Sequence, residues 1–140
     1  ISNPAIPMVG SVDVSNGISK PEDVDVDPSG NYFYVVNSGN NTFQIYDVTA
    51  DKSAPILKST IATGNQPRFV KVSGNYAYIS NYLDHTVQRI NISIKAAPFV
   101  ESTIPAAINP TGLSVIGNLV YNVSFNNGNA GTLNIINVCP

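Results

Sequence analysis

Several residue types are scarce in this sequence, and each shortage narrows the functions open to it. Tryptophan does not occur among the 140 residues. Glycan-binding modules stack sugars on aromatic side chains, with Trp prominent, so a sugar-binding module has little support and would have to use tyrosines. The tyrosines that could substitute are Tyr32, Tyr76 and Tyr82.

Cysteine and histidine occur once each, which limits catalytic chemistry. Cys139 has no partner within the chain, so it is either an inert thiol or a candidate for an intermolecular disulfide. Every Ser-His-Asp or Cys-His arrangement would have to use His85, because such devices need their groups together in space. His85 lies in a predicted loop, where we expect an ordinary solvated residue. The sequence therefore predicts no catalytic residues, no cofactor and no enzyme.

Charge is also low. Charged residues make up 11% of the chain, with seven Lys and Arg against nine Asp and Glu, for a net charge of −2. No basic run occurs, so nucleic-acid binding is not expected. Pro, Gly and Asn interrupt every apolar stretch well short of the ~20 residues that span a bilayer, so membrane insertion is not expected. The chain begins at Ile1, which suggests that a signal peptide, a tag or an upstream region is not included.

What the sequence does contain is a repeat. The segment SGNYFY at residues 29–34 returns as SGNYAY at 73–78 and, more weakly, as IGNLVY at 116–121. The last tyrosines of these segments lie 44 and 43 residues apart. Prolines at 21, 67 and 110 and threonines at 42, 86 and 132 follow the same period.

Each of these repeated positions begins a short segment in which apolar and polar residues alternate and β-branched residues are common. Gly, Asn, Asp or Pro bounds each segment, and this combination is typical of strands. Helical periodicity is absent. The expected strands are 7–14, 21–26, 31–37, 42–48, 55–62, 67–72, 75–81, 86–92, 98–104, 110–115, 118–124 and 132–138.

Four strands at this period predict an all-β fold of β-propeller blades. The strands form three four-stranded antiparallel repeats in the order d-abcd-abcd-abc. We treat residues 1–140 as a single domain with units of about 7–48, 55–92 and 98–138. Tyrosines that recur in every repeat, at 34, 78 and 121, are expected in the core between blades.

The repeat also resembles a known family. The segment YVVN at 34–37, followed by SGNNT at 38–42, is similar to the YVTN type of propeller repeat, and YISN at 78–81 is a variant. The third unit departs from it with YNVS at 121–124, and the Ala-Pro segments before the d strands are similar to LVIVD repeats. The resemblance covers nearly the whole chain. It implies the fold but not the function, since such repeats occur in surface-layer-like proteins, adhesins, cofactor-containing enzymes and lactonase-like hydrolases.

Three blades do not easily close a ring, because propellers have about four to eight. Two solutions are open. Two copies could close head to tail into a six-bladed ring, with residues 7–14 of one completing the last blade of the other; without closure the same contact builds a filament. Alternatively, the missing blades belong to a longer chain. We favour the first, so the expected partner is another copy of this chain.

Two sets of side chains are candidates for a site. Asp23, Asp25 and Asp27 alternate along the first strand and are weak candidates for a hard cation such as Ca²⁺. The other repeats lack these carboxylates, so no metal site is predicted. Because strand a is innermost, Asp25, Lys71 and Ser114 are expected to line the central channel.

Three sequons make Asn40, Asn91 and Asn122 glycosylation candidates. The repeat, the low charge, the Asn-rich loops and the lack of convergent catalytic groups favour a non-catalytic extracellular or cell-surface module that acts in self-assembly or protein binding. The alternative is a fragment of a larger propeller enzyme, either a lactonase-like or a cofactor-binding hydrolase.

Overall fold

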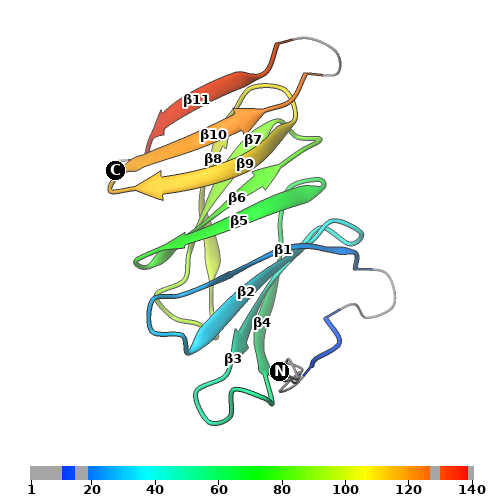
Figure 1. Ribbon diagram of the computed structural model, residues 1–140, viewed down its shortest axis with the longest axis vertical. Coiled ribbons are helices and arrows are strands. Elements are labelled where there is room, and N and C mark those ends of the chain that lie inside the picture. Colours follow the sequence, from blue (N-terminus) through cyan, green and yellow to red (C-terminus); the bar gives the residue numbers. More distant parts are fainter. Residues whose placement is uncertain (1–10, 15–18, 127–129, 139–140) are drawn as a thin grey trace, which may run out of the picture.

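The computed structural model describes residues 11–14, 19–126 and 130–138. These residues form three antiparallel sheets, which we call blades 1, 2 and 3 (Figure 1). Blade 1 consists of β1 (Pro21–Val26), β2 (Tyr32–Asn37), β3 (Thr42–Asp47) and β4 (Ile56–Ala62). Blade 2 consists of β5 (Pro67–Ser73), β6 (Tyr76–Asn81), β7 (Thr86–Asn91) and β8 (Phe99–Pro105). Blade 3 consists of β9 (Pro110–Ile116), β10 (Leu119–Ser124) and β11 (Thr132–Asn137).

The all-β prediction is confirmed, and each of these eleven strands lies within one residue, at either end, of a predicted one. The described part of the chain contains no helix, and therefore none able to cross a membrane. Of the outer strand expected at 7–14, residues 11–14 lie in no strand and the rest fall outside the described residues. Each d strand pairs with the c strand before it, so blades 1 and 2 span 21–62 and 67–105. The predicted units are therefore offset from the sheets by one strand.

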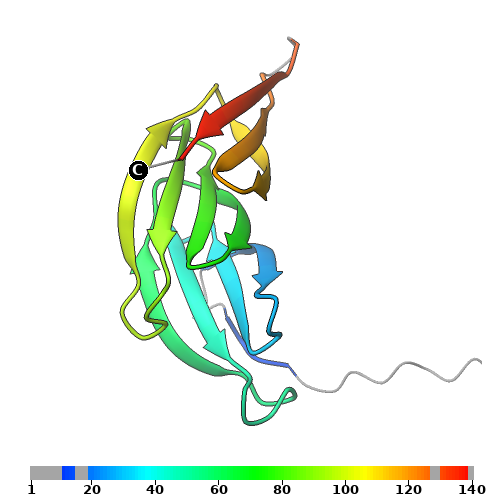
Figure 2. The same ribbon diagram turned by 90° about the vertical axis from the view of Figure 1, so that its left-hand side faces the viewer.

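The three blades stand side by side and present the same strand to the inside. Figure 2 shows β1, β5 and β9 along one side of the molecule, with β4 and β8 along the other. The inner strands β1 and β5 are in contact with each other, as are β5 and β9. This is the arrangement of neighbouring propeller blades around a central axis.

The core lies between the blades, because each sheet is apolar on both faces. Blade 1 contributes Tyr34, Val36, Phe43 and Ile45 to a cluster completed by residues of blade 2. A second cluster joins Tyr78 and Val87 of blade 2 to blade 3. The expected place of Tyr34 and Tyr78 in the inter-blade core is thus confirmed. Tyr121 lies on the face of blade 3 that no described residue covers.

Glycine closes the hairpin between the first two strands of every blade. Gly30, Gly74 and Gly117 have φ values of 65°, 57° and 56°, a region that an L side chain adopts only at a cost. In blade 1 the Gly30 N–H donates to the Asp27 carbonyl at 2.9 Å, as expected for a turn that opens on Asp-Pro. The recurring glycine thus serves hairpins of different length, because Val26 pairs with Phe33 in blade 1 whereas Ser73 pairs with Tyr76 in blade 2 and Ile116 with Leu119 in blade 3.

Candidate functional site

Each inner strand contains a β-bulge at its second residue. The pairing register shifts between Pro21 and Asp23 in β1, between Pro67 and Phe69 in β5, and between Pro110 and Gly112 in β9. The bulged residues are Glu22, Arg68 and Thr111. Bulges redirect a side chain and are common next to functional sites. Since the inner strands are neighbours, the bulges gather these side chains at one end of the inner surface.

An ion pair joins the first two bulges. The Arg68 guanidinium Nη1 lies 3.3 Å from Glu22 Oε2, and the Ser38 hydroxyl donates to Glu22 Oε1 at 2.5 Å. The Arg68 guanidinium also stacks over the Tyr82 ring, 5.0 Å from its centroid. The side chains of Arg68 and Glu22 remain 37% and 26% exposed, so a solute at the inner surface can reach both charges.

A second ion pair follows one step along the same strands. Lys71 Nζ lies 3.1 Å from Asp25 Oδ1, with the lysine side chain 46% exposed. The other oxygen of Asp25 accepts a hydrogen bond from the Val72 N–H at 2.7 Å. Carboxylates and cations therefore alternate across the interface between β1 and β5.

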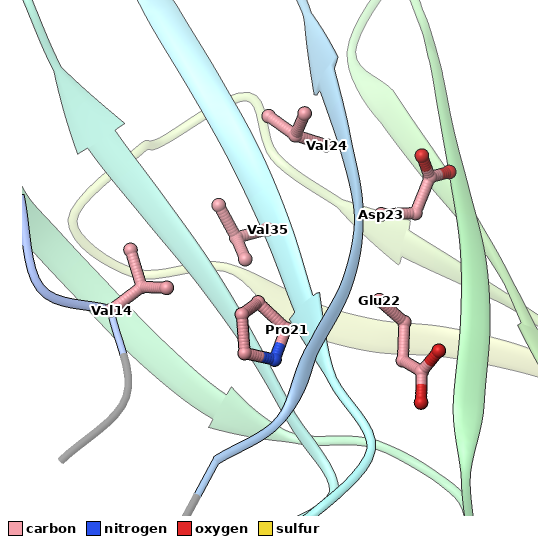
Figure 3. Close-up of a pocket in the computed structure, with 6 residues that line it drawn as sticks. All are labelled: Val14, Pro21, Glu22, Asp23, Val24 and Val35. Carbon is pink, nitrogen blue, oxygen red and sulfur yellow. The ribbon is translucent and has the colours of Figure 1, made fainter. Parts of the chain in front are cut away.

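The carboxylates of β1 also satisfy the free edge of β5. Asp23 Oδ2 accepts from the Val70 N–H at 3.0 Å, as Asp25 does from the Val72 N–H. Figure 3 shows Glu22 and Asp23 on one side of β1, with Val24 and Val35 on the other. An open groove of about 340 Å³ lies beside β1 and is lined by Val14, Pro21, Glu22, Asp23, Val24 and Val35.

The three aspartates proposed as weak metal candidates do not converge on one point. Asp27 belongs to the turn that follows β1, where its Oδ1 accepts from the Asn31 and Tyr32 N–H groups at 3.2 and 3.3 Å. Asp23 and Asp25 are occupied by the edge of β5. Among the described residues there is no cluster of three or more His, Cys, Asp and Glu side chains able to hold a metal ion.

The three candidate channel residues occupy equivalent positions on the inner strands, where Asp25 pairs with Tyr34, Lys71 with Tyr78 and Ser114 with Tyr121. Asp25 and Lys71 form the ion pair described above, whereas Ser114 is exposed on β9, opposite Tyr121. Ser114 lines a shallow pocket of about 250 Å³ on the uncovered face of blade 3, together with Gly112, Leu113, Tyr121, Val123 and Leu133.

The sequon asparagines differ in their surroundings. Asn40 is half-buried, and its Oδ1 accepts a hydrogen bond from the Thr42 hydroxyl at 2.8 Å. Asn122 is fully buried, and its amide donates to the Gly112 carbonyl at 3.0 Å, so a glycan there would have to displace the core. Cys139 lies outside the described residues.

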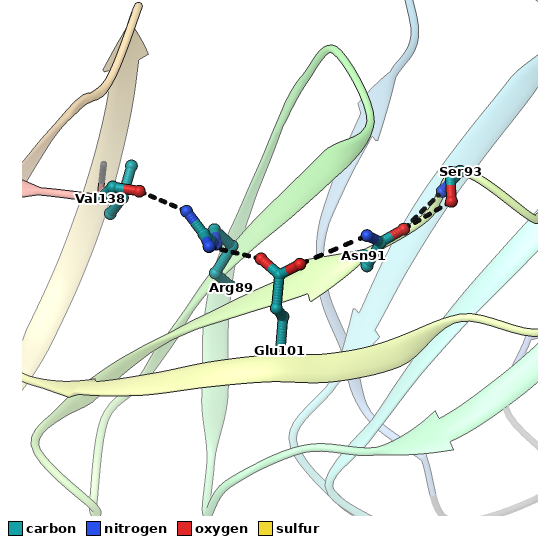
Figure 4. A network of polar contacts seen from close by, with 5 residues as sticks. All are labelled: Arg89, Asn91, Ser93, Glu101 and Val138. Atoms are coloured by element: carbon teal, nitrogen blue, oxygen red, sulfur yellow. Dashed lines mark hydrogen bonds and ion pairs between the residues drawn. The ribbon is translucent and has the colours of Figure 1, made fainter. Parts of the chain in front are cut away.

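Asn91, the remaining sequon residue, belongs to a polar network between blades 2 and 3 (Figure 4). Arg89 of β7 pairs with Glu101 of β8 at 2.5 Å and donates to the Val138 carbonyl that follows β11. Asn91 donates to Glu101 and accepts from the Ser93 hydroxyl and N–H. The network ties the end of blade 3 to blade 2.

Sequence reasoning missed Arg68 and gave Glu22 no role. The signal that could have identified them is the position directly after the recurring proline, which holds Glu22, Arg68 and Thr111 in the three repeats. Alternation alone assigns this position to one face of a regular strand. The bulge moves it out of that pattern.

A family described as "Lactonase, 7-bladed beta-propeller" matches residues 6–111 of this chain. No curated protein matches the chain. The match includes all of blades 1 and 2 and the inner-strand residues Glu22, Asp25, Arg68 and Lys71.

Solved structures agree on the fold. Kuenenia stuttgartiensis hydrazine synthase superposes with a TM-score of 0.67 at 18% identity, over 81% of this chain and 32% of that one. A candidate 6-phosphogluconolactonase from Bacteroides uniformis gives 0.65 at 18%, over 90% and 44%. The periplasmic gluconolactonase of Pseudomonas aeruginosa gives 0.57 at 16%, over 84% and 40%. The chain spans less than half the length of these structures, and identities this low establish the fold alone.

Proposed function

The chain belongs to the family of seven-bladed β-propeller lactonases, and from this we propose that its blades form part of a propeller that hydrolyses a lactone. The observation that carries the proposal is the row of partly exposed charges on the inner strands, which lies within the matched region. This is the alternative of the sequence analysis, and the family match favours it over the non-catalytic hypothesis.

The inner row contains the groups that the reaction requires. In lactone hydrolysis a water oxygen adds to the ring carbonyl, the ring C–O bond breaks, and the released alkoxide takes a proton to give the open hydroxy acid. A carboxylate such as Glu22 can accept the proton of the attacking water. A cation such as Arg68 or Lys71 can stabilise the negative charge that develops on the carbonyl oxygen. The two cations also suit an anionic sugar lactone, as the name of the Bacteroides uniformis protein suggests.

The test is hydrolysis of glucono-δ-lactone, with and without a 6-phosphate, followed by acid release. It is run on the protein in its native assembly, whose mass is first measured by light scattering. Glu22→Gln should lower kcat/KM by about 100-fold or more. Lys58→Gln serves as the matched control, because Lys58 forms its ion pair with Asp47 away from the inner strands. The proposal is contradicted if the protein hydrolyses neither lactone, or if Glu22→Gln is as active as Lys58→Gln.

We also propose that another blade covers the uncovered face of blade 3. In blade 1, Phe43 and Ile45 are fully buried against blade 2. Their counterparts by strand register, Leu133 and Ile135, are 60% and 62% exposed. Side chains of this kind at this position are buried at the equivalent junction, so a further blade is the fitting partner. A second copy of the chain and further blades of a longer chain remain the two sources.

Light scattering separates these sources for the chain as given. A second copy doubles the particle mass, and Ile135→Glu should then restore the monomer, whereas Thr60→Glu on β4 should not. A monomeric particle assigns the covering blade to additional sequence. The assignment of the repeats to the YVTN type and an extracellular location stay part of this proposal.

The same uncovered face supports a second candidate function, a non-catalytic module for self-assembly or protein binding. It is distinguished from the lactonase by outcome. An intact assembly that hydrolyses no lactone, and whose assembly is lost in Ile135→Glu, supports the second candidate over the first.

A further inference from the structure

His85 connects blade 2 to blade 3 through one ring nitrogen. It lies in the turn between β6 and β7, and its Nδ1 accepts a hydrogen bond from the backbone N–H of Asn109 at 3.0 Å. Asn109 directly precedes β9 and is 8% exposed, so this N–H has little access to water. The same Nδ1 lies 3.1 Å from the carbonyl oxygen of Tyr82, within its own turn. One nitrogen thus has a donor on one side and an acceptor on the other.

The junction between blades 1 and 2 contains the same connection built from a different residue. Asn41 occupies the equivalent turn position, with φ 55° against 54° for His85. Its Oδ1 accepts from the backbone N–H of Gln66, which precedes β5, at 2.9 Å. An amide oxygen is an acceptor at every ordinary pH, whereas an imidazole nitrogen is an acceptor only while it carries no proton.

We propose that His85 is a pH-sensitive link between blades 2 and 3. With Nδ1 unprotonated, the ring accepts from Asn109 and fixes the start of β9. A proton on Nδ1 makes it a donor to the Tyr82 carbonyl and leaves the Asn109 N–H without an acceptor. Blade 3 is then attached less firmly to blade 2, while the junction between blades 1 and 2 is unchanged.

Two ionisable groups lie near the His85 ring, Asp84 and Arg68. The adjacent Asp84 carboxylate interacts electrostatically with His85, and it is itself held by hydrogen bonds from the Asn65 N–H and side-chain amide. The Arg68 guanidinium packs on the Tyr82 ring of the same turn. The facing segments 63–66 and 106–109 contain no ionisable side chain.

The experiment uses the fact that His85 is the single histidine of the chain, so a ¹⁵N-histidine label reports on it alone. The Nδ1 resonance is followed from pH 8 to pH 5. Amide hydrogen-exchange protection factors are measured for Asn109 and Gln66 over the same range. We expect Nδ1 to be unprotonated at pH 8 and the protection of Asn109 to fall roughly tenfold by pH 5. Gln66, the internal control, should keep its protection.

His85→Asn is the matched variant, because Asn already occupies this turn conformation at position 41. Its Asn109 protection should be the same at both pH values. The proposal is overturned if Nδ1 carries a proton at pH 8, or if the protection of Asn109 in the original chain does not depend on pH. Loss of Asn109 protection in acid that persists in His85→Asn overturns it equally. The readout does not involve lactone hydrolysis, so it stands apart from the proposed function.

Discussion

Replacing Asp23 by alanine tests how the blades are joined. Asp23 Oδ2 accepts from the Val70 N–H at 3.0 Å, and Val70 is 3% exposed. Without the carboxylate this N–H is left buried with no acceptor, which costs about 2 kcal/mol, within a range of roughly 1–3. With an unfolding entropy of about 2.1 cal/mol/K per residue, the 140-residue chain should melt about 7 °C lower.

Two variants make the result specific. Asp23→Asn keeps an oxygen acceptor and should lose less than half as much stability. Asp25→Ala should also lose less, because Val72 is only half-buried and its freed N–H can reach water. Thermal unfolding followed by circular dichroism gives the melting temperatures, and hydrogen exchange at Val70 shows whether its amide is released. If Asp23→Ala has the same melting temperature as Asp23→Asn and the Val70 amide stays protected from exchange, the carboxylate does not join the blades.

Three further predictions concern Tyr34, Gly64 and Asp84. Among the described residues the fully buried Tyr34 hydroxyl has no hydrogen-bond partner, so Tyr34→Phe should change the free energy of unfolding at pH 7 by less than about 1 kcal/mol. Burial raises the pKa of Tyr34 above its ordinary value of 10.0, so the contribution of the protonated hydroxyl to stability is lost as pH rises above 10. The free energy of unfolding in urea should therefore fall less between pH 7 and pH 10.5 in Tyr34→Phe than in the original chain. A Cβ at Gly64 would lie 2.7 Å from Asn81 Cγ, and since Asn81 is fully buried, Gly64→Ala should cost about 1–3 kcal/mol in urea unfolding; a variant as stable as the original chain would contradict this contact. Hydrogen bonds from Asn65 lower the pKa of Asp84, so its contribution is present above the ordinary carboxyl range and lost as pH falls below it. A carboxyl NMR titration of Asp84 that shows an ordinary midpoint would refute the bond.

The strands were predictable because the signals are local. Gly, Asn and Pro recur with the repeat and end each strand, and alternation places Tyr34 and Val36 on one face. Positive φ at Gly30 and its counterparts follows from the residue itself. The order of strands in each sheet follows from hairpin connections, which need no long-range information.

The candidate site was only partly predictable. Asp25 and Lys71 were chosen because strand a is innermost, and both lie on inner strands in contact with each other. Glu22 and Arg68 were missed because a bulge inserts one residue, and nothing in a period-two pattern reveals where the register shifts. The link from His85 to Asn109 was missed as well, since it joins two loops 24 residues apart.

The sequence by itself determined the type and order of the eleven described strands, because hydrogen-bonding pattern and turn chemistry are properties of neighbouring residues. Only the tertiary structure decided which charges meet across the blades, which asparagines are buried and which apolar face is left uncovered. Those outcomes depend on how one sheet packs against the next, because residues 47 positions apart, such as Asp23 and Val70, meet only after that packing is complete.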